Sequence, residues 1–183
     1  MALQIIFFHG GGSKEDFEAD KKLVESLEDQ LGASYVVHYP FLPDDGSPDL
    51  GRRRQIKQAI SDSEDGAILV AHSLGASMLL ACLSEFDVER KIAGVFLIAT
   101  PFWQGSEDWV EAFKLPPDFA EKIDRKTPLF FYHCIDDEEV PFEQLAIYKQ
   151  QLPWAIFREI SIGGHQFNDD LSIVAADIRG LSQ

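Results

Sequence analysis

Six apolar runs, nearly all separated by helical patterns, constrain the fold of this 183-residue chain more than any other feature. The runs are Leu3 to Phe8, Tyr35 to Tyr39, Ala67 to Ala71, Ile92 to Ala99, Leu129 to Ile135 and Ala155 to Ile162. Apolar residues recur at helical spacing between most of them, as in 15–31, 53–61 and 142–152. Strands that alternate with helices predict a parallel sheet flanked by helices on both faces.

Several residues that could take part in catalysis or ligand binding come directly after predicted strands. They are His9-Gly10-Gly11, Ser73, the pair Asp136-Asp137, and His165. The carboxyl ends of parallel strands meet at one edge of a sheet, and ligands bind outside that edge. We therefore expect these four groups to lie together.

Ser73 lies between the apolar run 67–71 and a helix predicted over 77–83. A connection this short is typical of a nucleophile elbow, a strained strand-to-helix turn that exposes a serine hydroxyl. Such a turn needs small residues two positions before and after the serine, which Ala71 and Gly75 supply. The alternative is that Ser73 only caps the following helix.

A serine hydroxyl needs a neighbouring base to act as a nucleophile. Among the five histidines, His165 follows the last predicted strand on a glycine-flanked loop, which leaves it free to reach Ser73. Asp136 and Asp137 both lie at a strand end between the two in sequence, and the order Ser, acid, His is that of an α/β-hydrolase triad. We predict a catalytic group of Ser73, one of these two aspartates, and His165.

Acyl transfer also requires hydrogen-bond donors for an oxyanion. The backbone N–H of Leu74, directly after the serine, is one candidate. The second is expected from the triple glycine after the first strand, with Gly11 preferred and Gly12 as the alternative. A phosphate-binding loop is disfavoured, because Glu15 takes the last position of a G-x-G-x-x-G pattern and there is no G-K-[ST].

Together these motifs resemble the α/β-hydrolase superfamily, and the chain is similar to its compact serine hydrolases of the retinoblastoma-binding-protein-9 and YdeN type. The resemblance rests on His9-Gly10-Gly11, Tyr39-Pro40-Phe41-Leu42-Pro43, Ala71-His72-Ser73-Leu74-Gly75, Thr100-Pro101-Phe102-Trp103, Asp137 with Val140-Pro141, and Gly164-His165. It implies a three-layer α/β fold with a six-stranded parallel sheet of order 2-1-3-4-5-6. It also favours Asp137 over Asp136, because the family places its acid three residues before the Val-Pro pair.

One α/β-hydrolase domain is expected over 1–183, with a small cap inserted at about 102–126. That segment is rich in aromatic residues and is broken by Pro116-Pro117. His9, Trp103, Trp109 and Phe113 are the candidate pocket residues. The alternative for the cap aromatics is that they only pack the cap onto the sheet.

The net charge of −15 argues against nucleic acid or an anionic membrane as a partner. We interpret the basic cluster Arg52-Arg53-Arg54 as a solvated helix start, and no metal-ligand spacing stands out. No apolar run is long enough to span a bilayer and no secretory signal is visible, so a cytoplasmic protein is expected. The predicted function is a cofactor-free, carboxylesterase-like serine hydrolase for a small ester, thioester or amide. The alternative is a binding module that keeps the fold with little turnover; the oligomeric state is not predicted.

Overall fold

A computed structural model of the chain describes residues 2–181. Its centre is a six-stranded, wholly parallel sheet of order β2-β1-β3-β4-β5-β6, which confirms the expected order. The strands are β1 (Leu3–Phe8), β2 (Tyr35–His38), β3 (Ala67–His72), β4 (Ile92–Ile98), β5 (Leu129–Cys134) and β6 (Ile156–Ile160). The order reverses between β1 and β3, so the elbow lies beside the first loop.

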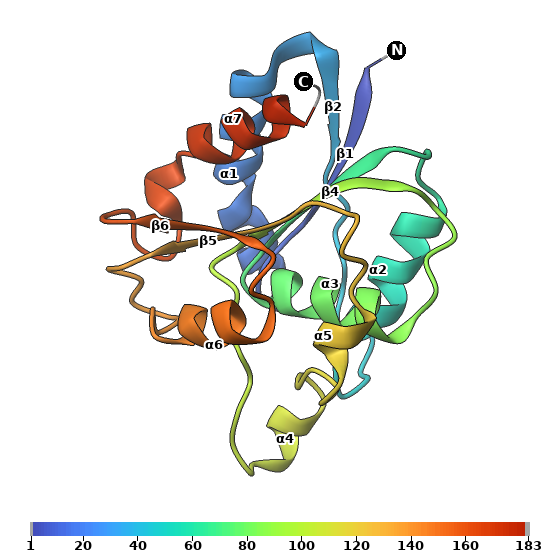
Figure 1. Cartoon of the computed structure of the whole chain (residues 1–183), viewed down its shortest axis with the longest axis vertical. Coiled ribbons are helices and arrows are strands. Elements are labelled where there is room, and N and C mark those ends of the chain that lie inside the picture. The colour runs from blue at the N-terminus through green and yellow to red at the C-terminus, as the bar shows by residue number, and fades with distance from the viewer. Residues whose placement is uncertain (1, 182–183) are drawn as a thin grey trace.

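Helices cover both faces of the sheet and give three layers (Figure 1). They are α1 (Lys14–Leu31), α2 (Arg52–Ser61), α3 (Leu74–Glu85), α4 (Asp108–Glu111), α5 (Phe119–Lys122), α6 (Gln144–Gln151) and α7 (Ser172–Gly180). The core under α1 and α7 is separate from the core under α2, α3 and α6. Within residues 2–181, no helix combines the length and the apolar character needed to cross a membrane.

The burial of the strands follows their place in the sheet. Every residue of the central strands β3 and β5 is buried, because helices cover both of their faces. The edge strands β2 and β6 instead mix half-buried with exposed positions. β6 ends at Ile160, two residues earlier than predicted, because Ile162 has left the sheet and is 73% exposed.

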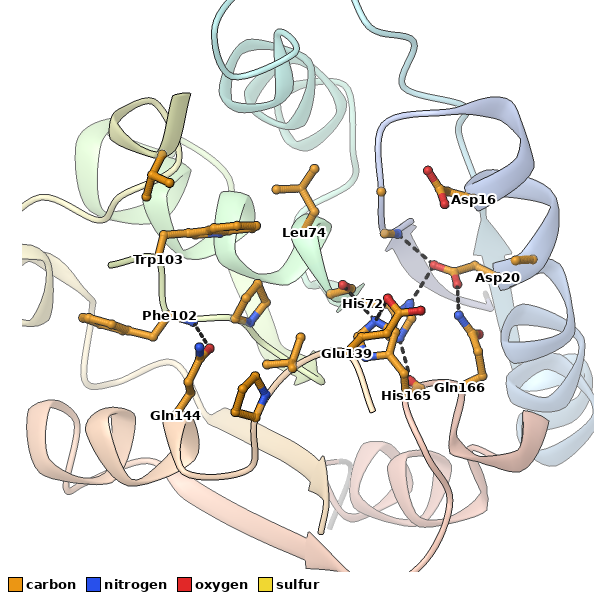
Figure 2. Close-up of a pocket in the computed structure, with 18 of the residues that line it drawn as sticks. Asp16, Asp20, His72, Leu74, Phe102, Trp103, Glu139, Gln144, His165 and Gln166 are labelled. Carbon is orange, nitrogen blue, oxygen red and sulfur yellow. Dashed lines mark hydrogen bonds and ion pairs between the residues drawn. The ribbon is translucent and has the colours of Figure 1, made fainter. Parts of the chain in front are cut away.

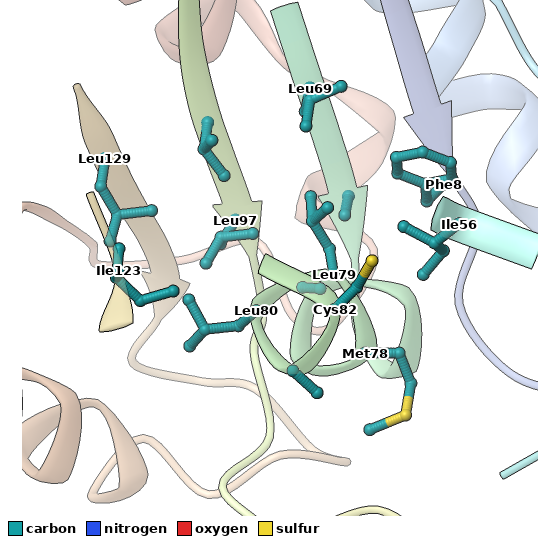
Figure 3. Packing of buried hydrophobic residues seen from close by; sticks show 14 of the residues in the cluster. Phe8, Ile56, Leu69, Met78, Leu79, Leu80, Cys82, Leu97, Ile123 and Leu129 are labelled. Atoms are coloured by element: carbon teal, nitrogen blue, oxygen red, sulfur yellow. The ribbon is translucent and has the colours of Figure 1, made fainter. Parts of the chain in front are cut away.

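Helix α3 begins at Leu74, three residues before the predicted start, so it follows Ser73 without any loop. It is apolar on nearly every side, and most of its residues are buried. Figure 3 shows Leu79 and Leu80 of α3 packed beneath Leu69 of β3 and Leu97 of β4. This burial fixes the direction in which the chain leaves the turn at Ser73.

Helix α1 starts with a capping box. The Ser13 hydroxyl accepts the Asp16 N–H at 3.1 Å, and the Asp16 carboxylate accepts the Ser13 N–H at 3.0 Å. The buried side of the helix carries four aliphatic residues and one carboxylate, Asp20. The start of α1 therefore has a defined position next to the glycine loop.

Residues 102–126 contain only the one-turn helices α4 and α5. In Figure 1 α4 projects away from the sheet, at the bottom of the view. The part nearest the sheet is anchored: the Phe102 N–H donates to the Gln144 side chain at 2.7 Å, and Trp103 Nε1 donates to Ser77 Oγ at 3.0 Å. The segment is thus tied to both α6 and α3.

Candidate active site

The turn at Ser73 has the strained geometry of an elbow. Ser73 has φ 51° and ψ −123°, in a region that residues with a side chain rarely adopt. Its N–H donates to the Ile98 carbonyl at 2.8 Å, which anchors the turn to β4. A Cβ on Gly75 would overlap the carbonyl oxygens of His9 and Phe8, which explains the small residue at this position.

Three side chains from three strand ends form one hydrogen-bonded chain. Ser73 Oγ lies 3.0 Å from His165 Nε2, and His165 Nδ1 lies 3.1 and 3.0 Å from the two carboxylate oxygens of Asp137. The side chains of His165 and Asp137 are 4% and 0% exposed. The order hydroxyl, imidazole, carboxylate is the one that lets a histidine accept a serine proton while its other nitrogen stays oriented.

The Asp137 carboxylate is held by several donors at once. Its Oδ1 accepts the N–H groups of Glu139 at 2.9 Å and Val140 at 2.8 Å, and His133 Nε2 lies 3.4 Å from Oδ2. Burial alone would raise the pKa of Asp137. The hydrogen bonds from His133, His165 and the two backbone groups outweigh it and hold this pKa well below its usual range. Asp137 is therefore ionised.

Asp136, the alternative acid, faces the backbone of the histidine loop instead. Its carboxylate accepts the N–H groups of Gly163 and Gly164, each at 2.9 Å. Glu138 adds a third anchor by accepting the His165 N–H at 3.0 Å. In the acidic run after β5, Asp137 thus contacts the imidazole, while Asp136 and Glu138 hold the backbone of the loop that carries it.

The triple glycine after β1 presents one uncommitted donor. The Gly10 N–H donates to Asp20 Oδ2 at 2.8 Å, and the Gly12 N–H donates to Asp16 Oδ2 at 3.0 Å. The Gly11 N–H between them finds no acceptor within residues 2–181. This favours Gly11 over Gly12 as a donor to a bound oxyanion.

Leu74 supplies a matching donor from the other side of Ser73. As the first residue of α3, it has an N–H without an acceptor inside the helix. No other acceptor for it occurs in the described part of the chain. The N–H groups of Leu74 and Gly11 are the pair expected for an oxyanion hole.

A cavity of about 740 Å³ opens in front of Ser73. Trp103 and Phe102 lie on one side of it and Asp16 and Asp20 on the other, as Figure 2 shows. Four carboxylate side chains line it, and no lysine or arginine does: Asp16, Asp20, Glu107 and Glu139. Asp20 is buried against His72, so the negative charge at the rim comes from Asp16, Glu107 and Glu139, and one wall of the cavity is aromatic.

Two of the four predicted pocket residues line this cavity and two do not. Trp103 lines it, and so does Trp109, which is 61% exposed. Phe113 packs behind Trp103, with ring centroids 5.2 Å apart, so its role is packing. His9 is fully buried behind the glycine loop, where it cannot reach the cavity.

The model of the alpha/beta hydrolase family matches residues 5–177. The chain belongs to this family. Membership indicates a hydrolase, while leaving its nucleophile and substrate open. The sequence matches no curated protein at a significant level.

Solved structures with the same fold resemble this hydrolase at low sequence identity. The ydeN gene product from B. subtilis is 19% identical, with a TM-score of 0.68 and 99% of each chain covered. The esterase domain of a Rhodothermus marinus protein is 19% identical, with a TM-score of 0.67, covering 98% of this chain and 85% of that one. Est1E from Butyrivibrio proteoclasticus is 14% identical, with a TM-score of 0.72, covering 99% and 87%.

The basic cluster in the first turn of α2 is not the solvated helix start that the sequence suggested. Arg52 is fully buried in the hydrolase, Arg53 is half-buried against Asp49, and only Arg54 is solvated. Arg52 Nη2 donates to the Gly11 carbonyl at 2.7 Å. The glycine loop is thus held from behind by a buried cation that sequence reasoning missed.

His9 completes this support. Its Nδ1 donates to the Gly10 carbonyl at 2.6 Å, and its Nε2 accepts the Leu42 N–H and Arg52 Nη1, each at 3.1 Å. Burial and the Arg52 charge lower the pKa of His9 to about 4, so the ring is neutral. Burial also lowers the pKa of Arg52 to about 10, which leaves it charged at neutral pH.

Replacing Gly11 by alanine is expected to lower kcat by about 10²-fold, because alanine keeps the backbone N–H but the loop that carries it is displaced from the oxyanion. Gly11 has φ +55°, and a Cβ there would overlap the Asp16 carboxylate, so the loop must shift. The left-handed conformation alone costs alanine about 1–2 kcal/mol. Ester hydrolysis and thermal unfolding of the purified variant measure both effects.

Gly46→Ala is the matched control for this change. Gly46 also has a positive φ, +80°, but a Cβ there would meet open space. It should lose stability through backbone strain and keep the wild-type kcat. Equal kcat values for the two variants would contradict the assignment of Gly11 to the oxyanion hole.

Proposed function

We propose that this protein is a serine hydrolase that cleaves a small ester, thioester or amide through an acyl-enzyme on Ser73. The observation that carries the proposal is the chain of contacts from Ser73 Oγ through His165 to Asp137, with 3.0 Å at the first step, at the wall of a cavity. Family membership supports hydrolysis in general. Ester bonds are the first candidates, which makes the activity carboxylesterase-like.

In the first half-reaction, Ser73 Oγ attacks the substrate carbonyl carbon while His165 Nε2 takes its proton. The carbonyl oxygen becomes an oxyanion, which the N–H groups of Leu74 and Gly11 stabilise. Collapse breaks the bond to the leaving oxygen, sulfur or nitrogen, and His165 returns the proton to that atom. Asp137 stays ionised and stabilises the imidazolium.

Water then enters the position that the leaving group has vacated. His165 accepts one of its protons as the hydroxide attacks the acyl carbon, and the same two donors hold the second oxyanion. The acyl–Oγ bond breaks, Ser73 regains its proton from Nε2, and the acid leaves. The side chains of Ser73, His165 and Asp137 and the two backbone N–H groups carry every step of this proposed reaction, which needs no cofactor.

Residues 102–126 are proposed to act as a small cap on this reaction. The segment contributes Phe102, Trp103 and Trp109 to the cavity wall, where they suit an apolar acyl or leaving group. The carboxylates at the rim repel anionic substrates. A small neutral ester with an apolar group fits this lining best.

Wild-type protein is expected to be labelled by a fluorophosphonate probe, and Ser73→Ala is expected to remain unlabelled. The probe phosphonylates a serine only when a base activates it and an oxyanion hole receives the phosphoryl oxygen. In-gel fluorescence measures the labelling, with heat-denatured protein as the background. Ser61→Ala, at an exposed serine of α2, should label like the wild type. Folded wild type that stays unlabelled would favour the binding module.

A further inference from the structure

A second histidine–carboxylate pair lies directly behind Ser73. His72, the last residue of β3, and Asp20 of α1 are each 1% exposed. His72 Nδ1 is 2.9 Å from Asp20 Oδ2. The proposed reaction assigns neither residue a step, yet both contact the segments that surround the serine.

Both ring nitrogens of His72 face hydrogen-bond acceptors. Nδ1 faces the Asp20 carboxylate, and Nε2 lies 3.0 Å from the backbone carbonyl oxygen of His165. A neutral imidazole has one N–H and can satisfy only one of them, whereas an imidazolium satisfies both. The geometry therefore indicates a charged His72.

The surroundings of Asp20 indicate the matching negative charge. Besides His72, its carboxylate accepts the Gly10 N–H at 2.8 Å and the Gln166 side-chain amide at 3.2 Å. Three N–H donors favour the ionised carboxylate, although burial opposes it. The pair is thus a buried ion pair with its hydrogen bonds satisfied.

The directions of the pKa shifts agree with this arrangement. Burial would raise the pKa of Asp20, but the charge and hydrogen bond of His72 outweigh it and lower this pKa. Burial would lower the pKa of His72, but Asp20 outweighs it and raises this pKa. The other ionisable groups that face His72 are Asp137, after β5, and His165, after β6, whose ring centroid lies 4.7 Å away. The β4 residue paired with His72 is the aliphatic Ile98.

The ion pair connects three separate segments of the site, as the dashed lines in Figure 2 show. Through the Gly10 N–H it holds the glycine loop after β1, which carries the proposed oxyanion donor Gly11 and is called the oxyanion loop below. Through the carbonyl of His165 and the side chain of Gln166 it holds the loop after β6 that carries the base. Ser73 follows His72 directly in the chain, so these contacts fix the positions of both loops relative to Ser73.

We propose that Asp20 and His72 are positioning residues of the reaction, whose ion pair holds the His165 loop and the oxyanion loop in register with Ser73. This inference rests on the proposed function for its catalytic meaning. Neither side chain touches the reacting atoms; both act through backbone groups. A displacement of about 1 Å in such a group can lower a rate about 10²-fold.

Titration of His72 gives the proposal a signature. The acceptors on both ring nitrogens indicate that His72 donates from Nδ1 and Nε2. Because pairing with Asp20 raises the pKa of His72, both hydrogen bonds persist to a higher pH than for a free histidine and are lost as the pH rises through that pKa. Because the pKa of Asp20 is lowered, acid breaks the pair only well below neutral pH. Deprotonated His72 must release either Asp20 or the His165 carbonyl. Wild-type kcat should therefore fall on the alkaline side.

The experiment follows the histidine rings by ¹⁵N NMR from pH 5.5 to 9.5, and kcat and KM for p-nitrophenyl acetate over the same range. In wild type, His72 should carry protons on both nitrogens at pH 7, and its titration should coincide with the alkaline fall of kcat. In Asp20→Asn, His72 should be neutral at pH 7. The kcat of the Asp20→Asn variant should drop about 10- to 100-fold, with KM changed by less than about threefold. Asp29→Asn, an exposed aspartate of the same helix, should match wild type in both measurements.

Three results would overturn the inference. One is a neutral His72 in wild type at pH 7, which needs no variant to detect. The second is a folded Asp20→Asn protein with wild-type kcat and pH profile, even if its melting temperature falls, because the pair would then be structural only. The third is a wild-type alkaline fall of kcat that does not follow His72. Folded wild type that neither hydrolyses esters nor reacts with a fluorophosphonate would sink the proposed function instead, while the NMR still reports the ion pair.

Discussion

Replacing His165 by alanine is expected to lower kcat for ester hydrolysis by roughly 10⁶-fold. Its Nε2 lies 3.0 Å from Ser73 Oγ and is the only imidazole nitrogen recorded within hydrogen-bond distance of that hydroxyl in residues 2–181. Without it Ser73 has no group that can take its proton. The Glu139 carboxylate, 3.6 Å from His165 Nε2, is 67% exposed and makes no hydrogen bond to the Ser73 hydroxyl within residues 2–181.

Single-turnover kinetics with an activated ester would measure this loss, together with circular dichroism to check the fold. His38→Ala is the matched control, because His38 is an exposed histidine on the edge strand β2. It should keep wild-type kcat. A His165→Ala protein that retains more than about one per cent of the wild-type kcat would mean that another group serves as the base.

Replacing Asp137 by asparagine is expected to lower kcat by roughly 10⁴-fold. Both backbone donors, Glu139 N–H and Val140 N–H, contact Oδ1, so the asparagine oxygen is expected to stay there. Its amide nitrogen then takes the place of Oδ2, 3.0 Å from His165 Nδ1. It would donate to Nδ1, put the ring proton on Nε2, and leave Ser73 facing a donor.

Asp136→Asn is the control for the same chemical change one residue earlier. Asp136 holds the N–H groups of Gly163 and Gly164, and an asparagine oxygen can still accept them. Its kcat should stay within about tenfold of wild type. Steady-state kinetics on both variants decide the matter, and a reversed ranking would reassign the acid to Asp136.

The architecture could be predicted because it depends on short-range patterns. Alternating apolar and helical segments indicate a parallel sheet, and the family resemblance supplies its order. The contacts of Asp136 and Asp137 could not be separated by spacing alone, since a shift of one residue in the strand end exchanges them. The backbone N–H groups of residues 139 and 140 decide which carboxylate turns inward.

Contacts between distant charged residues were harder to predict. Arg52 belongs to a basic cluster that suggests a solvated surface, and its partners His9 and Gly11 lie about forty residues earlier in the chain. Asp20 lies among charged residues of α1, but it is three and four residues before Leu23 and Val24 and so lies on the buried side of the helix. Buried charges need specific partners. A short stretch of sequence shows the charged residue, but it does not show partners that lie far away in the chain.

The two carboxylates of α1 that bind the neighbours of Gly11 determine when the glycine loop becomes ordered. Asp20 and Asp16 bind the N–H groups of Gly10 and Gly12, so docking of the first helix already gives the glycine loop its shape. The entropy of ordering that loop is therefore lost once, when the chain folds, and not again in each catalytic cycle. In the proposed reaction, a substrate carbonyl that arrives beside Ser73 would meet a donor that is already aligned, and little reorganisation would remain as charge develops on its oxygen.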